Sequence, residues 1–298
     1  MKILCYHGVT AEKNHRIVNF NKKHIKKNIF EKQMKLLRKK YNPISIKKVF
    51  NNLKNKVPFN GKDVCVTFDD GFENNFKIAT KILSKYKIPA IFYICPEIID
   101  KQEMFWVDKI EATISFCKKS KIELKFKNYF FKHNISSVKL KINAIKKFKK
   151  ICKSLRDKDK DQIINELIKI TEVIPRSNMS PLYKVANWEQ IKKTTKNQLF
   201  DIGGHSLRHS IFTNMSLKAV KEDIINTKKM IYKRTGFRVK HFSYPEGKCN
   251  PKIIKLMKKN NILTCPLAHG LNNNHHQDPF KLKRIMVDFE KVKFPYKY

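Results

Sequence analysis

The stretch VTFDDGFENN, residues 66–75, places two adjacent carboxylates directly after a short apolar run. Residues 64–68 have the mostly apolar pattern of a buried strand, so Asp69 and Asp70 are expected at its C-terminal end. Neighbouring carboxylates repel each other, and burying either one without a partner costs free energy. A bound cation would remove that cost. A solvated turn is the alternative, because Asp-Gly is a common turn dipeptide.

Short apolar runs and amphipathic helical patterns alternate along most of the chain. Strands are predicted at residues 3–6, 64–68, 90–94, 200–203, 240–243, 262–265 and 283–287, and helices at 29–41, 78–86, 188–195, 217–235 and 251–260. Strand–helix–strand order implies parallel strands joined by right-handed crossovers. About seven such strands predict a barrel-like parallel α/β domain, in which functional residues lie at the C-terminal ends of the strands.

A segment of about residues 97–186 interrupts this alternation. It contains FWVDKIEATISF, SSVKLKINAIKKFKKICKSL and DKDKDQIINELIKI, all with helical spacing of their apolar residues. Pro175 and Pro181 mark its exit. We interpret the segment as a helical insertion or lid within a single domain of residues 1–298, and not as an independent domain.

The chain is strongly basic, with 65 Lys and Arg against 25 Asp and Glu and a net charge of +40. A nucleic-acid-binding or anionic-surface-binding protein is therefore one candidate. The lysines are spread along the whole sequence, however, and aromatic–glycine RNA-binding motifs are missing, which argues against nucleic acid. The excess charge would still attract a nucleotide sugar or, weakly, an anionic membrane face.

The cysteines and the first residues bear on the cellular compartment. The seven cysteines include no C-x-x-C pair and indicate neither a disulfide framework nor a cysteine zinc site. MKILCYHGVT lacks the apolar core of a secretion signal, and no run approaches the roughly 18 apolar residues of a membrane span. These features predict a cytoplasmic protein, with membrane association left open.

GGHSLRHS, residues 203–210, is the second informative stretch. His205 and His209 are four residues apart, so one turn of helix would point both rings the same way. That spacing suits two nitrogen ligands of one cation, and a carboxylate from Asp70 would make a third. Three protein ligands leave a position for water and substrate, as in a catalytic zinc site. Two partly exposed histidines are the alternative.

Five motifs occur in an order that resembles the polysaccharide deacetylase family, also called the NodB homology family or carbohydrate esterase family four. They are ILCYHGV at 3–9, TFDDG at 67–71, HSLRH at 205–209, FSYPEG at 242–247 and KLKRIMV at 281–287. The resemblance implies a deformed (β/α) barrel of about seven parallel strands. It also implies metal-dependent removal of acetyl groups from N-acetylated sugars of a surface polysaccharide, or from its nucleotide- or lipid-linked precursor, with zinc as the expected metal.

The resemblance assigns roles to the motif residues. Asp69 would be the general base, and Asp70 would bind the metal together with His205 and His209. A cyclic amide hydrolase is a second possible activity, because barrels related to this family also open cyclic imides.

The FSYPEG segment differs from the family pattern. The backbone amide of Glu246 is expected to stabilise the reaction's oxyanion, with Tyr244 and Pro245 against the substrate. Many members have R-x-P-Y at residues 243–246, and that arginine is missing here. Our hypothesis is that Arg284, from another strand, supplies the cation that orients Asp69.

The remaining candidates are less well defined by motif. His7 ends the first predicted strand and is the preferred general acid, while His269 is an alternative and a core-edge histidine is the non-catalytic interpretation of His7. Trp106 and Asp108 would line the sugar site from the insertion, or Trp106 would only anchor the insertion helix. Trp188 is interpreted as a packing residue.

Overall fold

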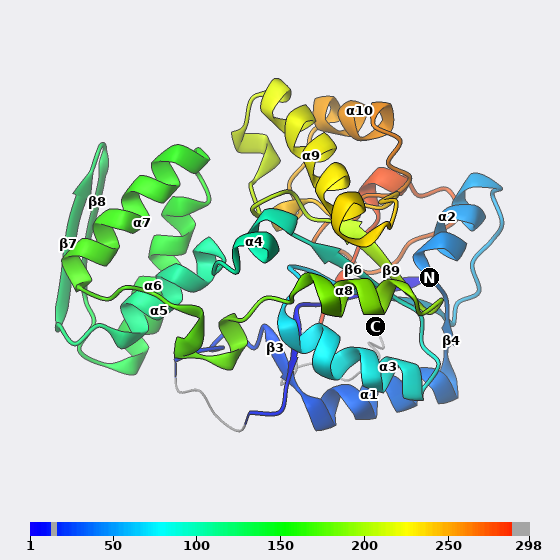
Figure 1. Ribbon diagram of the computed structural model, residues 1–298, viewed down its shortest axis with the longest axis horizontal. Helices are drawn as coiled ribbons and strands as arrows, with labels where there is room; N and C mark the ends of the chain where they lie inside the picture. Colours follow the sequence, from blue (N-terminus) through cyan, green and yellow to red (C-terminus); the bar gives the residue numbers. More distant parts are fainter. Residues whose placement is uncertain (13–16, 288–298) are drawn as a thin grey trace. The chain divides into compact units, whose positions relative to one another are not determined.

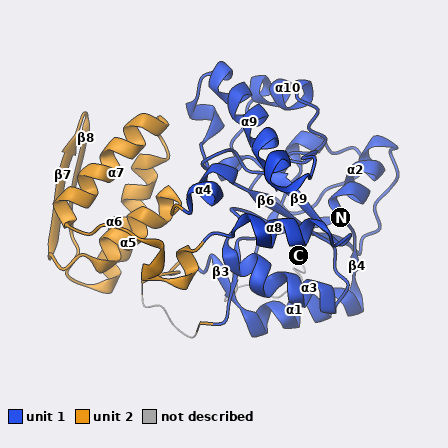
Figure 2. Ribbon diagram, viewed as in Figure 1, with its two compact units in different colours: residues 1–11, 22–102, 185–298 blue, residues 12–21, 103–184 orange. Residues whose placement is uncertain are grey.

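The computed structural model describes residues 1–12 and 17–287 (Figure 1). The chain forms two compact units, with residues 1–11, 22–102 and 185–298 in unit 1 and residues 12–21 and 103–184 in unit 2 (Figure 2). Residues 288–298 of the predicted single domain lie outside the described part of the chain. Unit 2 covers most of the expected insertion at about 97–186.

Unit 1 is built on a parallel sheet. Its strands, in spatial order, are β10 (Ile285–Met286), β1 (Lys2–Tyr6), β5 (Asp63–Phe68), β6 (Ala90–Ile94) and β9 (Phe200–Gly204), with β4 (Asn42–Pro43) also paired to β5. Every one of these pairs is parallel. A separate parallel pair joins β2 (Gly8–Thr10) to β3 (His24–Lys26). The parallel α/β class predicted from the sequence is confirmed.

Three predicted strands are shorter in the structure than the sequence suggested, and the one at 283–287 is the two-residue β10. Residues 240–243 and 262–265 are reduced to isolated parallel bridges, Gly204 with Phe242 and His241 with Thr264. These bridges continue the curved sheet beyond β9. Within the described residues no strand pair joins Thr264 to β10, so the sheet stays open there. Proline and lysine around these positions interrupt the apolar run that a longer strand would need.

Helices surround this sheet. They are α1 (Lys27–Lys40), α2 (Ile46–Lys54), α3 (Thr80–Lys85), α4 (Pro96–Lys101), α8 (Trp188–Thr195), α9 (Leu217–Thr235) and α10 (Pro251–Lys259). A π-helical turn, Asn75–Ala79, leads into α3. Helices α9 and α10 pack together, as do α1 and α3 (Figure 1). The α2 helix and the β2–β3 pair were not predicted. Each is short, although α2 buries Ile46, Val49 and Leu53 on one face, as an amphipathic helix should.

Unit 2 combines helices with a hairpin. It contains α5 (Trp106–Phe116), β7 (Lys121–Phe126), β8 (Tyr129–Asn134), α6 (Val138–Cys152) and α7 (Asp157–Thr171). The three helices match the predicted helical segments. The antiparallel hairpin was missed, although β7 alternates exposed and buried residues as a half-buried strand should. Its inward side chains, Ile122 and Leu124, join an apolar core with Phe131 and Phe148.

The side chains on the two faces of β5 make different contacts. Phe68 stacks on its register partners Tyr6 and Phe92, with ring centroids 5.3 and 5.0 Å apart, and meets Phe30 of α1 at 5.8 Å. Because side chains alternate along a strand, Thr67 and the residue after the strand point to the other face. The Phe68 face therefore packs against α1. On the opposite face Cys65 joins an apolar cluster with residues of α2, and Thr67 and Asp69 follow it toward the strand end.

Among residues 1–12 and 17–287, each helix is too short or too polar to span a lipid bilayer.

The end of β9 requires glycine. A Cβ at Gly204 would lie 2.3 Å from the ring of Phe242, whereas a Cβ at Gly61 would meet nothing within 4 Å. We expect Gly204→Ala to reduce the free energy of unfolding by about 1–3 kcal/mol through overpacking, with little change in Gly61→Ala. Urea denaturation of both variants measures this, and equal stability of the two would contradict the packing argument.

Candidate active site

The two carboxylates follow β5 as predicted. The amide of Asp69 donates to the carbonyl oxygen of Tyr6 at 2.9 Å and so extends the β1–β5 ladder by one residue. Asp70 then has a φ of 75° and Gly71 a φ of 93°, which turns the chain sharply. Both carboxylates are buried, at 4% and 3% exposure. The solvated turn considered from the sequence is therefore not what forms.

The histidine pair follows β9. The amide of His205 donates to the carbonyl oxygen of Ile94 at 2.9 Å, which fixes it beside the end of β6. The expectation of one helical turn is wrong, since residues 206–208 form a tight turn and Ser206 and His209 have φ values of 61° and 58°. Ser210 N–H closes this turn on the Ser206 hydroxyl at 2.8 Å. Both rings are nevertheless buried and only 5.0 Å apart.

Asp70, His205 and His209 come together as a possible metal site. Their candidate ligand atoms all lie within 4.8 Å of one another. The Nε2 atoms of His205 and His209 lie 3.7 and 3.6 Å from Asp70 Oδ1. Ligands about 2.1 Å from an ion at tetrahedral angles would be about 3.4 Å apart, so the donor set fits one zinc-sized cation.

The hydrogen bonding of His205 supports this fit. Its Nδ1 lies 2.9 Å from the carbonyl oxygen of Ser243, which can only accept, so Nδ1 carries the proton. Burial lowers the pKa of His205, against the attraction of Asp69, so the ring is neutral near pH 7. The lone pair of Nε2 therefore faces Asp70, as a metal ligand requires.

Arg284 holds Asp69 through a bidentate ion pair. Nη1 and Nη2 donate to Oδ1 and Oδ2, both at 2.7 Å, and Arg284 is 1% exposed. Burial alone would raise the pKa of Asp69, but the charge and hydrogen bonds of Arg284 outweigh it and hold the pKa well below its usual range. The Cys5 thiol lies 3.7 Å from Oδ2 on the same face. Asp69 is thus ionised and fixed in orientation.

Further hydrogen bonds fix the arginine itself. It donates to the carbonyl oxygen of Leu267 at 2.7 Å, the hydroxyl of Ser243 at 2.9 Å and the hydroxyl of Thr67 at 3.3 Å. Ser243 occupies the position where many related sequences carry the arginine. Here it accepts from an arginine on the segment that leads into β10 instead.

Most of the chain matches a known protein family. Residues 56–264 match the family described as polysaccharide deacetylase. The chain belongs to this family. Its members hydrolyse N-acetyl amide bonds, so this chain is a hydrolase of the polysaccharide deacetylase type. No curated protein matches the sequence.

Solved structures with similar folds include three bacterial proteins. The Streptococcus pyogenes deacetylase PplD in complex with acetate is 14% identical with a TM-score of 0.63, over 96% of this chain and 92% of that one. IcaB from Ammonifex degensii is 17% identical with a TM-score of 0.61, over 96% and 91%. A de-N-acetylase from Aggregatibacter actinomycetemcomitans is 15% identical with a TM-score of 0.57, over 96% and 94%. The likeness confirms the deformed (β/α) barrel.

The other predicted site residues of this deacetylase differ from one another in how far they are buried. His7 is half-buried at the end of β1, and burial lowers its pKa to about 4 against the attraction of Asp69. Glu246 is half-buried with a φ of 56°, whereas the alternative acid His269 is exposed. Tyr244 is fully buried and Pro245 is buried, so neither side chain is exposed as a substrate contact would be.

The two candidates from the insertion lie in unit 2. Trp106 is 5% exposed and packs in the unit 2 core, with the Lys160 ammonium 5.2 Å from its ring centre. Asp108 is 1% exposed. The Trp106 ring therefore has little exposed surface on which a sugar could stack. Trp106 is the hydrophobic anchor of its helix, the alternative left open from the sequence.

Sequence reasoning missed Asp223, which supports the histidine turn of this deacetylase. Both of its carboxylate oxygens accept from the Leu207 amide at 3.1 Å, and Oδ1 also accepts from the Thr227 hydroxyl at 3.3 Å. It is 5% exposed on α9. A signal was present, because Asp223 interrupts the apolar face marked by Val220 and Ile224.

Loss of the Asp223 charge should loosen the turn that carries His205 and His209. We expect Asp223→Asn to weaken binding of a divalent metal ion roughly 10–100-fold, the usual cost of altering a group that orients metal ligands. Chelator competition measures the affinity. Asp201→Asn is the matched control, since Asp201 is a buried carboxylate paired with Lys47 at 2.8 Å and does not contact the turn. Unchanged metal affinity in Asp223→Asn would contradict the proposed support of the histidine turn.

Proposed function

We propose that this chain is a metal-dependent N-deacetylase acting on N-acetylated sugars of a surface polysaccharide or of its nucleotide- or lipid-linked precursor. One observation carries the proposal: three buried donors from Asp70, His205 and His209 lie within 4.8 Å of one another, beside a carboxylate held by arginine. Buried groups of this kind are stable together only when a ligand or partner compensates them.

Zinc is the proposed metal, because two imidazole nitrogens and one carboxylate oxygen are a donor set that zinc prefers. When bound, the cation would supply Lewis acidity that polarises the acetyl carbonyl and acidifies a water, which a carboxylate as weakly basic as Asp69 needs. The His205 proton stays on Nδ1 through its bond to Ser243. The same bond keeps the ring oriented.

Asp69 is the proposed general base. Arg284 keeps it ionised and aims both of its oxygens, at the cost of lowering its basicity. The proton that Asp69 takes from water then has to reach the leaving amine, and His7 is proposed as the group that passes it on. The Glu246 amide is proposed as an oxyanion donor.

The proposed substrate and compartment are argued from the chain's charge and its thiols. A net charge of +40 favours a substrate that carries a phosphate or pyrophosphate over a neutral polymer. Six of the seven cysteines are buried thiols, the form expected in a reducing compartment. A cytoplasmic enzyme acting on an activated precursor fits both features.

Metal content and acetate release together test the function. We expect about one zinc per chain, lost in Asp70→Ala and His205→Ala together with activity. Asp69→Asn should keep the zinc and lose roughly 10²–10⁴-fold in turnover, because it removes only the base. Elemental analysis measures the zinc content, and an acetate assay on a panel of N-acetyl sugars measures the turnover.

The panel also includes a cyclic imide, which separates ring opening from deacetylation. Acetate release that is unchanged in Asp69→Asn would remove that residue from the mechanism. Cleavage of the imide alone would remove the sugar substrate.

Substitution of Arg284 separates orientation of the base from metal binding. We expect Arg284→Lys, which keeps the charge but loses the two-pronged contact, to reduce turnover roughly 100-fold while zinc affinity changes little. Arg284→Met should reduce turnover further and destabilise the fold by about 3–5 kcal/mol, because Asp69 is left buried and unpaired. Steady-state kinetics measures turnover, zinc competition measures the zinc affinity, and urea denaturation measures the free energy of unfolding. Equal loss of turnover and zinc affinity in Arg284→Lys would contradict the assignment.

A further inference from the structure

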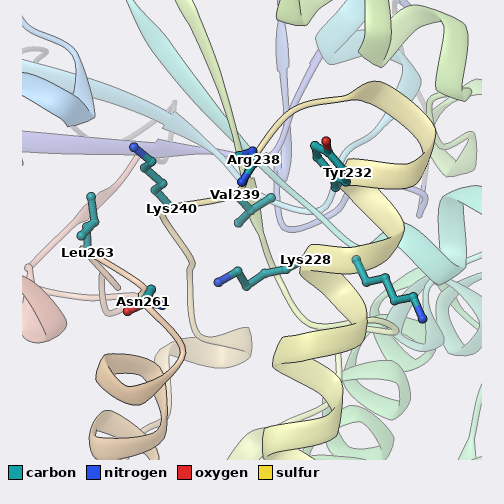
Figure 3. A pocket seen from close by; sticks show the side chains of 8 residues that line it. Lys228, Tyr232, Arg238, Val239, Lys240, Asn261 and Leu263 are labelled. Atoms are coloured by element: carbon teal, nitrogen blue, oxygen red, sulfur yellow. The ribbon is translucent and has the colours of Figure 1, made fainter.

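A pocket of about 480 Å³ lies in unit 1 away from the residues discussed so far. It is bounded by helix α9, by the segment before His241 and by the segment after α10 (Figure 3). Its lining residues are Lys228, Lys229, Tyr232, Arg238, Val239, Lys240, Asn261 and Leu263. Four of these eight side chains are cationic and none is acidic.

The pocket lies at the opposite end of the strands from the metal site. Lys240 and Leu263 are paired by a 2.7 Å backbone hydrogen bond just before the bridge of His241 with Thr264. Ser243, which contacts both Arg284 and His205, comes three residues after Lys240, or about 10 Å further along an extended chain. A ligand held by Lys240 is therefore not in position to present an acetyl group to Asp69.

The cations differ in how they are held. Lys228 is partly buried and its ammonium donates to the carbonyl oxygen of Asn260 at 2.5 Å, while burial lowers its pKa. Arg238 is exposed and lies over the Tyr232 ring at 5.3 Å. Lys240 is exposed as well. Positive charges that line one pocket without an acidic side chain among them repel one another, and an anion would relieve that repulsion.

Apolar surface accompanies the charge. Val239 is 3% exposed at the base of the pocket, and Leu263 and the Tyr232 ring line it as well (Figure 3). Inorganic phosphate would occupy only a small part of 480 Å³, a volume typical of sites for organic ligands. The lining therefore suits a molecule with an anionic group at one end and an apolar or aromatic group at the other.

We propose that this pocket, lined by Arg238, Lys240, Tyr232 and Val239, is a second ligand site that binds a phosphate ester carrying an apolar or aromatic group. A nucleotide and a phospholipid headgroup share this chemistry. Arginine provides planar hydrogen-bond donors for the phosphate, and the lysines add charge. This site goes beyond the deacetylation proposed above and does not depend on it.

Calorimetric titration of the full chain tests the proposal. The probes are uridine monophosphate, dihexanoyl phosphatidic acid below its micelle concentration, inorganic phosphate and uridine. We expect saturable binding of at least one ester, at least tenfold weaker binding of inorganic phosphate and uridine, and a decrease in affinity with added salt. The stronger of the two esters identifies whether the source is a nucleotide or a lipid.

A matched pair of double variants separates the pocket from the general positive charge. Arg238→Met/Lys240→Met should weaken ester binding at least tenfold, whereas Lys218→Met/Lys221→Met, which removes two exposed charges of helix α9 outside the pocket, should not. Ester binding that is weakened equally in the two double variants would overturn the proposal, as would the lack of saturable binding of either ester. Asp70→Ala should bind the ester as the wild type does, so failure of the metal site leaves this result unaffected.

Discussion

A bidentate ion pair between Asp69 and Arg284 lies inside the parallel sheet, with both side chains almost wholly excluded from water. Each buried charge costs several kcal/mol of desolvation free energy. This cost is offset only when the ion pair has favourable hydrogen-bond geometry and the remaining donors are hydrogen-bonded. Both conditions hold, because the guanidinium also donates to Leu267, Ser243 and Thr67. The pair therefore fixes the ends of β5 and β10 relative to each other through their side chains, although β1 separates these strands in the sheet.

Ser243 connects this pair to the metal ligands. Its hydroxyl oxygen accepts from Arg284, and its carbonyl oxygen accepts from His205 Nδ1. A displacement of the residue would thus affect the orientation of the base and of one metal ligand together. Asp223 supports the same group of residues from α9, through the Leu207 amide. The ligand geometry consequently depends on several elements that are distant in sequence.

The two ends of the sheet have opposite electrostatic character. Carboxylates and imidazoles gather beyond the C-terminal ends of β5 and β9, where parallel strands present functional residues. Lysine and arginine gather before residues 241 and 264, at the other end. A cation is thus favoured at one end and an anion at the other. The net charge of +40 does not distinguish the two ends, because it is a sum over the whole surface.

The sequence by itself determined the parallel α/β class and the positions of Asp69 and Asp70 after β5 and of His205 and His209 after β9. These are local properties, since apolar periodicity and adjacency in the chain fix where a strand ends and which residues come directly after it. Only the tertiary structure decided that Arg284 contacts Asp69, that Asp223 supports the histidine turn, and that Trp106 and Tyr244 are enclosed in cores. Those outcomes depend on how residues far apart in the sequence pack, including the φ values of Ser206 and His209 that replaced the expected helical turn. Such contacts leave no periodic pattern in the sequence, because the free energy that selects them comes from burial and pairing in the folded state.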